Sequence, residues 1–295
     1  MSFQATSNLP LRKITHWTLR EKKQRGEPIT ALTAYDYPTA RLIDEAEIDI
    51  VLVGDSVAMA VLGHESTLSL TMDEMLHHAK AVRRAVKSAL LVVDMPYGSY
   101  HTDDTEAVRN ALRFVREAGA EAVKLEGGAD RAPLVERLTR AEIQVVGHIG
   151  LTPQSVNRMG GYRVQGRSIP DIEKLMTDAV ALEAAGAIAL VLEGIPREVA
   201  TRITAAAGIP TIGIGAGPEC DGQILVFHDL FNLTFGPPAK FSRQYADGAS
   251  FFADALQQYR DDVAARRFPC DTESYHLPRE TRSALDSTRT AKAAG

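Results

Sequence analysis

The chain has 295 residues and a net charge of −5, with 45% hydrophobic and 24% charged residues. These proportions are ordinary for a soluble globular protein. The acidic balance argues against a nucleic-acid-binding protein, which usually presents a basic face. We find no apolar run near the roughly 20 residues that span a bilayer, no signal-peptide core at the N-terminus, and no metal or disulfide motif around Cys220 and Cys270. We therefore expect a cytoplasmic protein that binds neither nucleic acid nor membrane.

The predicted elements follow a regular alternation after an initial helix. Residues 10–25 are predicted to form an amphipathic helix that could close one end of a barrel. Eight apolar runs follow, each predicted to be a strand leading into a helix or a long loop. They cover residues 29–34, 49–54, 89–94, 120–125, 143–148, 187–193, 210–215 and 223–228. This alternation indicates parallel βαβ units. Eight such units predict an α/β fold of the (β/α)8 TIM-barrel class, with a doubly wound sheet as the alternative.

Helix signals mark several of the connections. Thr71 and Glu74 have the spacing of a capping box before a helix over 75–87, and Asp103 is placed to cap a helix over 107–117. A terminal helix is predicted over 251–266. We predict a single domain over residues 1–275 and a disordered tail over 276–295, because the tail has little to bury.

Five of the predicted strand regions end on residues that carry chemistry. The runs lead into Asp55, Asp94, Lys124 with Glu126, His148 and Glu193. Buried parallel strands are nearly continuous hydrophobic runs, and a buried ionisable group is costly unless it is paired or bound to metal. The strand C-termini of a barrel meet at one face, so these groups should converge on one pocket.

Asp55 and Asp94 are candidate ligands of a divalent cation. Mg²⁺ commonly takes one or two protein carboxylates and keeps positions for water and substrate, and Glu126 would supply a third carboxylate nearby. The alternative is that each aspartate caps a loop or pairs with an arginine. Ser56 could donate a hydrogen bond to a substrate oxygen, or could be a turn residue.

Lys124 and Glu126 lie two residues apart on one strand, so their side chains share a face. They suit carboxylate binding and a contact near a metal, and an internal salt bridge is the alternative. We assign His148 to substrate orientation, although a lone barrel histidine is often a packing residue.

Glu193 ends the most apolar strand in the chain. Burial would raise the pKa of its carboxyl toward the range of a general base. The alternative is an ion pair with Arg197 or Lys174.

Two loops remain ambiguous. The glycines of residues 213–217 follow the seventh strand, where barrels often bind phosphate, but a tight turn is equally compatible with them. Residues 158–168 could form a lid over the pocket or an ordinary surface loop. On the residues alone, the site favours metal-assisted proton abstraction next to a carbonyl of a small oxo acid. In this interpretation Lys124 neutralises the carboxylate and Glu193 takes the proton.

Eight ordered motifs resemble those of the ketopantoate hydroxymethyltransferase family. They are TAYDY (33–37), LVGDS (52–56), GHEST (63–67), VKLEGG (123–128), GHIGLTPQS (147–155), GGYRVQGR (160–167), IGIGAG (212–217) and DGQILV (221–226). The resemblance runs from about residue 10 to 275. It implies transfer of a one-carbon unit from 5,10-methylenetetrahydrofolate to 3-methyl-2-oxobutanoate, giving 2-dehydropantoate for pantothenate synthesis.

The resemblance also implies roles for the residues that match these motifs. Asp55 and Asp94 would be Mg²⁺ ligands in contact with substrate, with Glu126 a further carboxylate of the metal site. Ser56 and Lys124 would contact the substrate, His148 would lie in its pocket, and Glu193 would deprotonate C3. The family is a decamer of (β/α)8 barrels, so a homodecamer is expected. The motifs do not assign the folate contacts.

Two other functions share part of this pattern. A lyase or mutase of the phosphoenolpyruvate mutase and isocitrate lyase kind would also use Mg²⁺ and an oxo-acid enolate, but such enzymes usually rely on a loop cysteine, and neither Cys220 nor Cys270 fits that position. A non-catalytic binding protein would be expected to lack some of the strand-end groups, and all are present.

Overall fold

The computed structural model describes residues 12–292, with side chains described to residue 285. The chain divides into two compact units, Met1–Ala246 and Asp247–Gly295. The first unit contains a closed barrel of eight strands. The predicted single domain over residues 1–275 includes parts of both units and stays a prediction.

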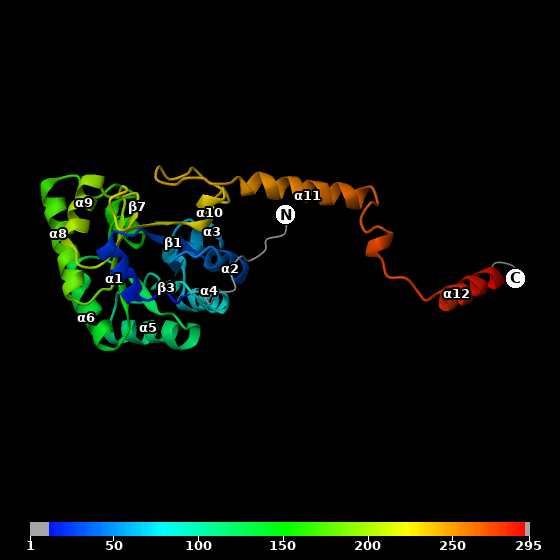
Figure 1. The fold of residues 1–295 in the computed structure, drawn as a ribbon, viewed down its shortest axis with the longest axis horizontal. Coiled ribbons are helices and arrows are strands. Elements are labelled where there is room, and N and C mark those ends of the chain that lie inside the picture. The colour runs from blue at the N-terminus through cyan, green and yellow to red at the C-terminus, as the bar shows by residue number, and fades with distance from the viewer. Residues whose placement is uncertain (1–11, 293–295) are drawn as a thin grey trace. The chain divides into compact units, whose positions relative to one another are not determined.

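The barrel confirms the predicted fold class (Figure 1). All eight strands pair in parallel with their sequence neighbours, and β1 pairs with β8 to close the ring. Each strand lies within or close to one of the eight predicted runs. The strands are β1 Ile29–Thr33, β2 Ile50–Val53, β3 Leu90–Asp94, β4 Ala122–Glu126, β5 Val145–Gly150, β6 Ala189–Glu193, β7 Thr211–Ile214 and β8 Gly222–Leu225.

Helices cover the outside of the barrel, and their ends follow the sequence signals. Thr71 and Glu74 form the predicted capping box of α4, and Asp103 caps α5 by accepting hydrogen bonds from the backbone of Thr105 and Glu106. The helices of this unit are α1 His16–Arg25, α2 Tyr37–Glu45, α3 Val57–Ala60, α4 Met72–Ala85, α5 Asp104–Ala118, α6 Ala132–Arg140, α7 Val156–Met159, α8 Ile169–Ala184, α9 Arg197–Ala206 and α10 Phe227–Leu230.

Helix α1 closes the end of the barrel at which the strands begin. Its Leu19 is fully buried in the cluster that fills the barrel interior, together with Ile29, Ile50 and Leu90. A second, larger cluster lies between the strands and the surrounding helices. The predicted start at residue 10 is wrong, because the helix begins at His16, where Thr15 forms a capping box. Residues 10 and 11 lie outside the described part of the chain.

Two lysines of α1 hold it against the strand starts. Lys22 Nζ lies 2.6 Å from an oxygen of Asp49, just before β2. Lys23 Nζ lies 2.7 Å from Asp221, just before β8. Both carboxylates also accept hydrogen bonds from a neighbouring strand, Asp49 from Thr30 and Asp221 from Thr211. Each of these charges is therefore paired one to one.

The second unit consists of α11 Gly248–Ala264, a short 3-10 turn Asp271–Glu273 and α12 Arg279–Lys292. Helix α11 confirms the terminal helix, with its start three residues earlier than predicted. None of the described side chains of this unit is buried. Residues 276–295 include α12 where the sequence predicts disorder, and with no described side chain buried there, disorder of this tail stays a prediction. Within residues 12–292, no helix is long and apolar enough to cross a membrane.

Candidate active site

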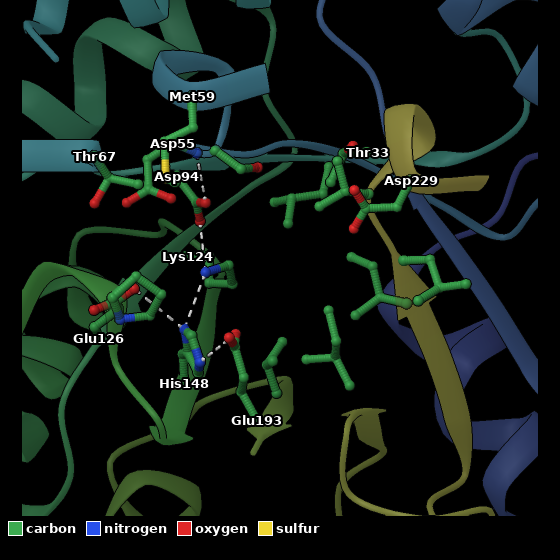
Figure 2. Close-up of a pocket in the computed structure, with 18 of the residues that line it drawn as sticks. Thr33, Asp55, Met59, Thr67, Asp94, Lys124, Glu126, His148, Glu193 and Asp229 are labelled. Carbon is green, nitrogen blue, oxygen red and sulfur yellow. Dashed lines mark hydrogen bonds and ion pairs between the residues drawn. The ribbon is translucent and has the colours of Figure 1, made fainter. Parts of the chain in front are cut away.

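A cavity of about 260 Å³ opens where the barrel strands end. Parallel strands around a closed ring all point their C-terminal ends at this mouth. The cavity brings together all seven residues that the sequence predicts as a site, and Figure 2 shows the acidic and basic members facing one another. They are Asp55, Ser56, Asp94, Lys124, Glu126, His148 and Glu193. Their convergence is a structural finding, while their roles stay predictions.

Asp55 and Asp94 lie side by side at the ends of β2 and β3. The backbone N–H of Asp55 donates to Asp94 Oδ2 at 3.0 Å. Burial, followed by the negative charge of Asp94, raises the pKa of the Asp55 carboxyl to about 7. Two buried carboxylates so close repel each other unless a proton or a cation intervenes. Of the two alternatives for these aspartates, an arginine partner is not found, because no arginine among the described residues lines this cavity and Asp94 pairs with Lys124 instead.

A glutamine and a tyrosine fix the orientation of two of these carboxylates. Gln154 Nε2 donates to Asp55 Oδ2 at 2.8 Å, and the Gln154 backbone N–H donates to Glu126 Oε2 at 3.0 Å. The amide oxygen of Gln154 accepts a hydrogen bond of 2.6 Å from Tyr100 Oη. All four residues are buried, so these directed bonds hold the carboxylates in place.

Lys124 is the only lysine or arginine among the described residues that line the cavity. Its Nζ lies 2.9 Å from Asp94 Oδ1. Burial would lower the pKa of this amine, but the charges of Asp94, Glu126 and Asp55 outweigh burial and raise it. The ammonium is therefore strongly retained. It pairs with Asp94 on the neighbouring strand rather than with Glu126 on its own strand.

His148 connects Lys124 to Glu193. Its Nδ1 lies 3.2 Å from Lys124 Nζ, and its Nε2 lies 3.2 Å from Glu193 Oε2. Burial and then the charge of Lys124 lower the pKa of the imidazole, so the ring is neutral. Because an ammonium only donates hydrogen bonds, Nδ1 is the accepting nitrogen and the ring proton belongs on Nε2, facing Glu193.

Glu193 does not form either of the alternative ion pairs. Arg197 pairs with Glu219, and Lys174 pairs with Asp178. The Glu193 side chain is 16% exposed, so it faces the cavity and is not fully buried in the core.

Two hydroxyl groups complete this part of the wall. Ser56 Oγ is 2.7 Å from the buried Tyr35 hydroxyl. Thr67 Oγ1 is buried at the cavity and has no hydrogen-bond partner. Buried polar atoms are normally paired, so Thr67 has spare capacity for a ligand.

The donor set fits a hard divalent cation. Among the described residues, no group of three or more His, Cys, Asp or Glu side chains has the arrangement of a complete metal site. A pair of carboxylates with room for water and substrate is, however, a usual Mg²⁺ arrangement. Asp94 Oδ1 has the Lys124 ammonium at 2.9 Å but makes no hydrogen bond of good geometry, and burial together with the charge of Asp94 raises the pKa of Asp55 although Lys124 opposes this. We conclude that a cation between these two aspartates would relieve both features.

The two ambiguous loops both reach the mouth. Gly215 has φ +62°, and a Cβ there would lie 2.6 Å from the ring of Phe241, which lines the cavity. These glycines therefore make a tight turn beneath an aromatic side chain, and phosphate binding by them stays a prediction. Tyr162 of the 158–168 loop also lines the cavity. That loop therefore borders the site, and its motion as a lid stays a prediction.

Sequence reasoning missed Asp229, which lines the cavity, and three buried residues behind it that bond to the site, Gln154, Tyr35 and Tyr100. Gln154, Tyr35 and Asp229 each come a few residues after a strand end, the same signal that singled out the seven predicted residues. Tyr100 carried no such signal, because it lies in the loop after β3 and reaches the site only through the fold. Asp229 was missed because it follows β8, the strand with the weakest apolar pattern.

The sequence of this chain matches a known protein family. The family model described as ketopantoate hydroxymethyltransferase matches residues 13–271. A protein of Koribacter versatilis named 3-methyl-2-oxobutanoate hydroxymethyltransferase is 63% identical over 280 residues, which are 95% of each chain. A protein of the same name from Moorella thermoacetica is 53% identical over 263 residues, covering 89% of this chain and 98% of the other.

Solved structures share the fold at much lower identity. A phosphonopyruvate hydrolase has a TM-score of 0.55 and 15% identity, with 95% of this chain and 98% of the other covered. A 2,3-dimethylmalate lyase of the phosphoenolpyruvate mutase and isocitrate lyase superfamily has a TM-score of 0.53 and 18% identity, with the same coverage. At these identities the likeness concerns the barrel alone.

Proposed function

The chain belongs to the ketopantoate hydroxymethyltransferase family, and we propose that it transfers a hydroxymethyl group to 3-methyl-2-oxobutanoate, giving 2-dehydropantoate for pantothenate synthesis. The one-carbon donor would be 5,10-methylenetetrahydrofolate. The observation that carries this proposal is the meeting of Asp55, Asp94, Lys124 and Glu193 in one cavity. Carboxylates for a cation, an ammonium for an anionic substrate and a poised base are the groups that this chemistry requires.

Lys124 would bind the substrate carboxylate and stabilise negative charge as it develops. Its ammonium is retained in the buried site, and an electrostatic interaction is stronger in such an environment than in water. Glu193 would remove the proton from C3. The neutral His148, whose Nε2 faces the Glu193 carboxylate, would orient this base.

Asp55 and Asp94 would hold Mg²⁺, with Glu126 contributing from the neighbouring strand. When bound there, the cation would polarise the 2-oxo group as a Lewis acid and favour charge on its oxygen. Gln154 and Tyr100 would keep the carboxylates of Asp55 and Glu126 in orientation, through the hydrogen bonds given above.

The transfer balances with water as a reactant. Loss of the C3 proton to Glu193 leaves an electron pair that forms the new bond from C3 to the folate-borne methylene carbon. The bonds from that carbon to the folate nitrogens break with their electrons remaining on nitrogen, and water supplies the hydroxyl oxygen. The two nitrogens take up the proton that Glu193 removed from C3 and one proton of the water. The products are 2-dehydropantoate and tetrahydrofolate.

Proton exchange at C3 tests the proposal. In deuterium oxide with Mg²⁺, the purified protein should exchange the C3 proton of 3-methyl-2-oxobutanoate for deuterium, followed by NMR, and should form 2-dehydropantoate when methylenetetrahydrofolate is added. Asp55→Asn and Asp94→Asn should weaken Mg²⁺ binding measured by calorimetry. A wild-type protein that shows neither exchange nor transfer with any divalent cation would refute the proposal.

Assembly and location complete the proposal. A homodecamer is the assembly that the family resemblance implies, and light scattering coupled to size-exclusion chromatography would give the subunit number. A cytoplasmic location is proposed on the same basis, and fractionation of the source cells would test it.

A further inference from the structure

Asp229 is a carboxylate of the same cavity that the chemistry above does not use. It lies on α10, directly after β8. Its two oxygens accept hydrogen bonds from side-chain hydroxyl groups, Oδ1 from Thr234 at 2.6 Å and Oδ2 from Ser242 at 2.9 Å. Among the described residues, no lysine, arginine or histidine forms an ion pair with it, and burial lowers the pKa of the adjacent His228. Asp229 is therefore a pre-oriented acceptor without a countercharge.

The closed ring sets Asp229 apart from the polar cluster, by which we mean Asp55, Asp94, Lys124, Glu126, His148 and Glu193. In an eight-stranded barrel β8 lies opposite β4, which carries Lys124 and Glu126. Figure 2 shows Asp229 and Thr33 on one side of the cavity and the labelled members of the polar cluster on the other. The remaining wall is mostly apolar, with Val191, Ile214, Ile224, Leu225 and Val226 among its residues.

This arrangement suits a flat ligand that is apolar on its faces and carries hydrogen-bond donors at one edge. A carboxylate has about four acceptor sites, and the two hydroxyls occupy only one on each oxygen of Asp229, so each oxygen can accept one more donor from a ligand. A carboxylate accepts two parallel N–H bonds from a planar group in a fork geometry. Phe241, one residue before Ser242, adds an aromatic face to the cavity wall near this end.

We infer that Asp229 binds the pterin edge of the folate co-substrate through the ring N3–H and the 2-amino group. This inference rests on the proposed function and assigns the folate end of the site. In the pterin bicycle, N5 and C6 belong to the ring remote from the 2-amino group. Fixing the amino edge at Asp229 therefore directs the one-carbon unit, bridged between N5 and N10, toward the opposite wall, where Lys124 and Glu193 would hold the oxo acid.

An analogue without the 2-amino group tests the contact in the wild-type enzyme. With saturating 3-methyl-2-oxobutanoate, we compare kcat/KM for 5,10-methylenetetrahydrofolate and its 2-desamino counterpart. The wild type should prefer the natural donor by about ten- to hundredfold, the usual range for one hydrogen bond to a charged group. A wild-type ratio near one would overturn the inference without touching the proposed function.

The variant Asp229→Asn should lose this discrimination. Its kcat/KM should fall about ten- to hundredfold with the natural donor and little further with the analogue, and its transfer rate should fall much more than its C3 proton exchange. Thr102→Ala is the matched control, because it removes an exposed hydrogen bond from a hydroxyl to the Glu106 carboxylate, neither residue of which lines the cavity, so its discrimination should remain that of the wild type. An Asp229→Asn enzyme that still distinguishes the two donors as well as the wild type would refute the inference. Absence of both exchange and transfer in the wild type would instead refute the proposed function.

Discussion

The two ends of the barrel treat buried charge in opposite ways. At the end closed by α1, Lys22 pairs with Asp49 and Lys23 with Asp221, so each carboxylate has its own ammonium. At the mouth, the single ammonium of Lys124 serves the carboxylates of Asp55, Asp94 and Glu126 together. The two carboxylates of the closed end are each neutralised by a lysine, whereas the carboxylates of the mouth outnumber its one ammonium.

This difference indicates that the charged residues of the closed end stabilise the fold, whereas those of the mouth are arranged to bind a ligand. Desolvation of a charge is compensated in the folded protein only where a partner is present. At the mouth that compensation is incomplete, and burial with neighbouring negative charge raises the pKa values of Asp55 and Glu126. Every substitution at the mouth should therefore affect activity, and removal of the one ammonium there should also cost stability, while substitutions at the closed end should affect stability alone.

Glu193→Gln should have the largest effect at the mouth. Removing a general base lowers the rate by about 10²- to 10⁴-fold, and the amide still fits beside His148. We expect that loss in both transfer and C3 exchange, with the thermal unfolding midpoint close to that of the wild type. Activity near the wild-type level would show that another group takes the proton.

Lys124→Met should affect both activity and stability, because it removes the ammonium that faces the carboxylates. Breaking a buried ion pair costs about 3–5 kcal/mol, so the free energy of unfolding in urea with a metal chelator should fall by that order. Lys80→Met is the control, since the Lys80–Glu117 pair is partly exposed and should cost less than about 1 kcal/mol. Equal losses in the two variants would show that the Lys124 ammonium is no more important for stability than a partly exposed lysine.

Lys22→Met tests the closed end. The variant leaves the buried Asp49 without its countercharge, although Thr30 still donates to it. The expected loss is about 1.5–3 kcal/mol, the value of a hydrogen bond to a charged group. The kcat of the folded enzyme should not change, because α1 lies at the far end of the barrel. A lowered kcat at full occupancy of the folded state would show that the two ends are coupled.

Thr71→Ala should give the smallest effect, away from both ends. It removes the hydroxyl that accepts the Glu74 N–H at the start of α4, and a lost N-cap costs about 1 kcal/mol. Thr71→Ser keeps the hydroxyl and should recover most of that stability. A loss in Thr71→Ala larger than in Lys22→Met would reverse the expected order.

The barrel and the seven predicted residues followed from one regularity of the sequence, in which apolar runs end on polar side chains. A strand in a closed parallel barrel has a fixed direction, so the end of each run already specifies which residues meet. Contacts that cross between loops could not be predicted in this way. Tyr100 reaches Gln154 from 54 positions away, and no local pattern encodes that distance.

The sequence pattern also could not predict which charged side chains of the site pair with one another. The pairing of Lys124 with Asp94 rather than with Glu126 depends on the register between β3 and β4, which positions Asp94 opposite Lys124. The start of α1 was misjudged because the amphipathic pattern continues upstream of Thr15, where the capping box actually begins the helix.

Closure of the ring between β1 and β8 also constrains how the protein is made. Thr30 pairs in register with Gln223, so the last strand must leave the ribosome before the first strand gains its second neighbour. At about 5–20 residues per second, the growing chain spends at least roughly ten seconds with an open strand edge. The backbone N–H and C=O groups of an unpaired strand edge can form hydrogen bonds with strands of other chains, which leads to aggregation. We expect nascent chains that end before residue 222 to be sensitive to protease and prone to aggregate. In chains long enough for β8 to pair with β1, all eight strands should become resistant to protease at the same chain length.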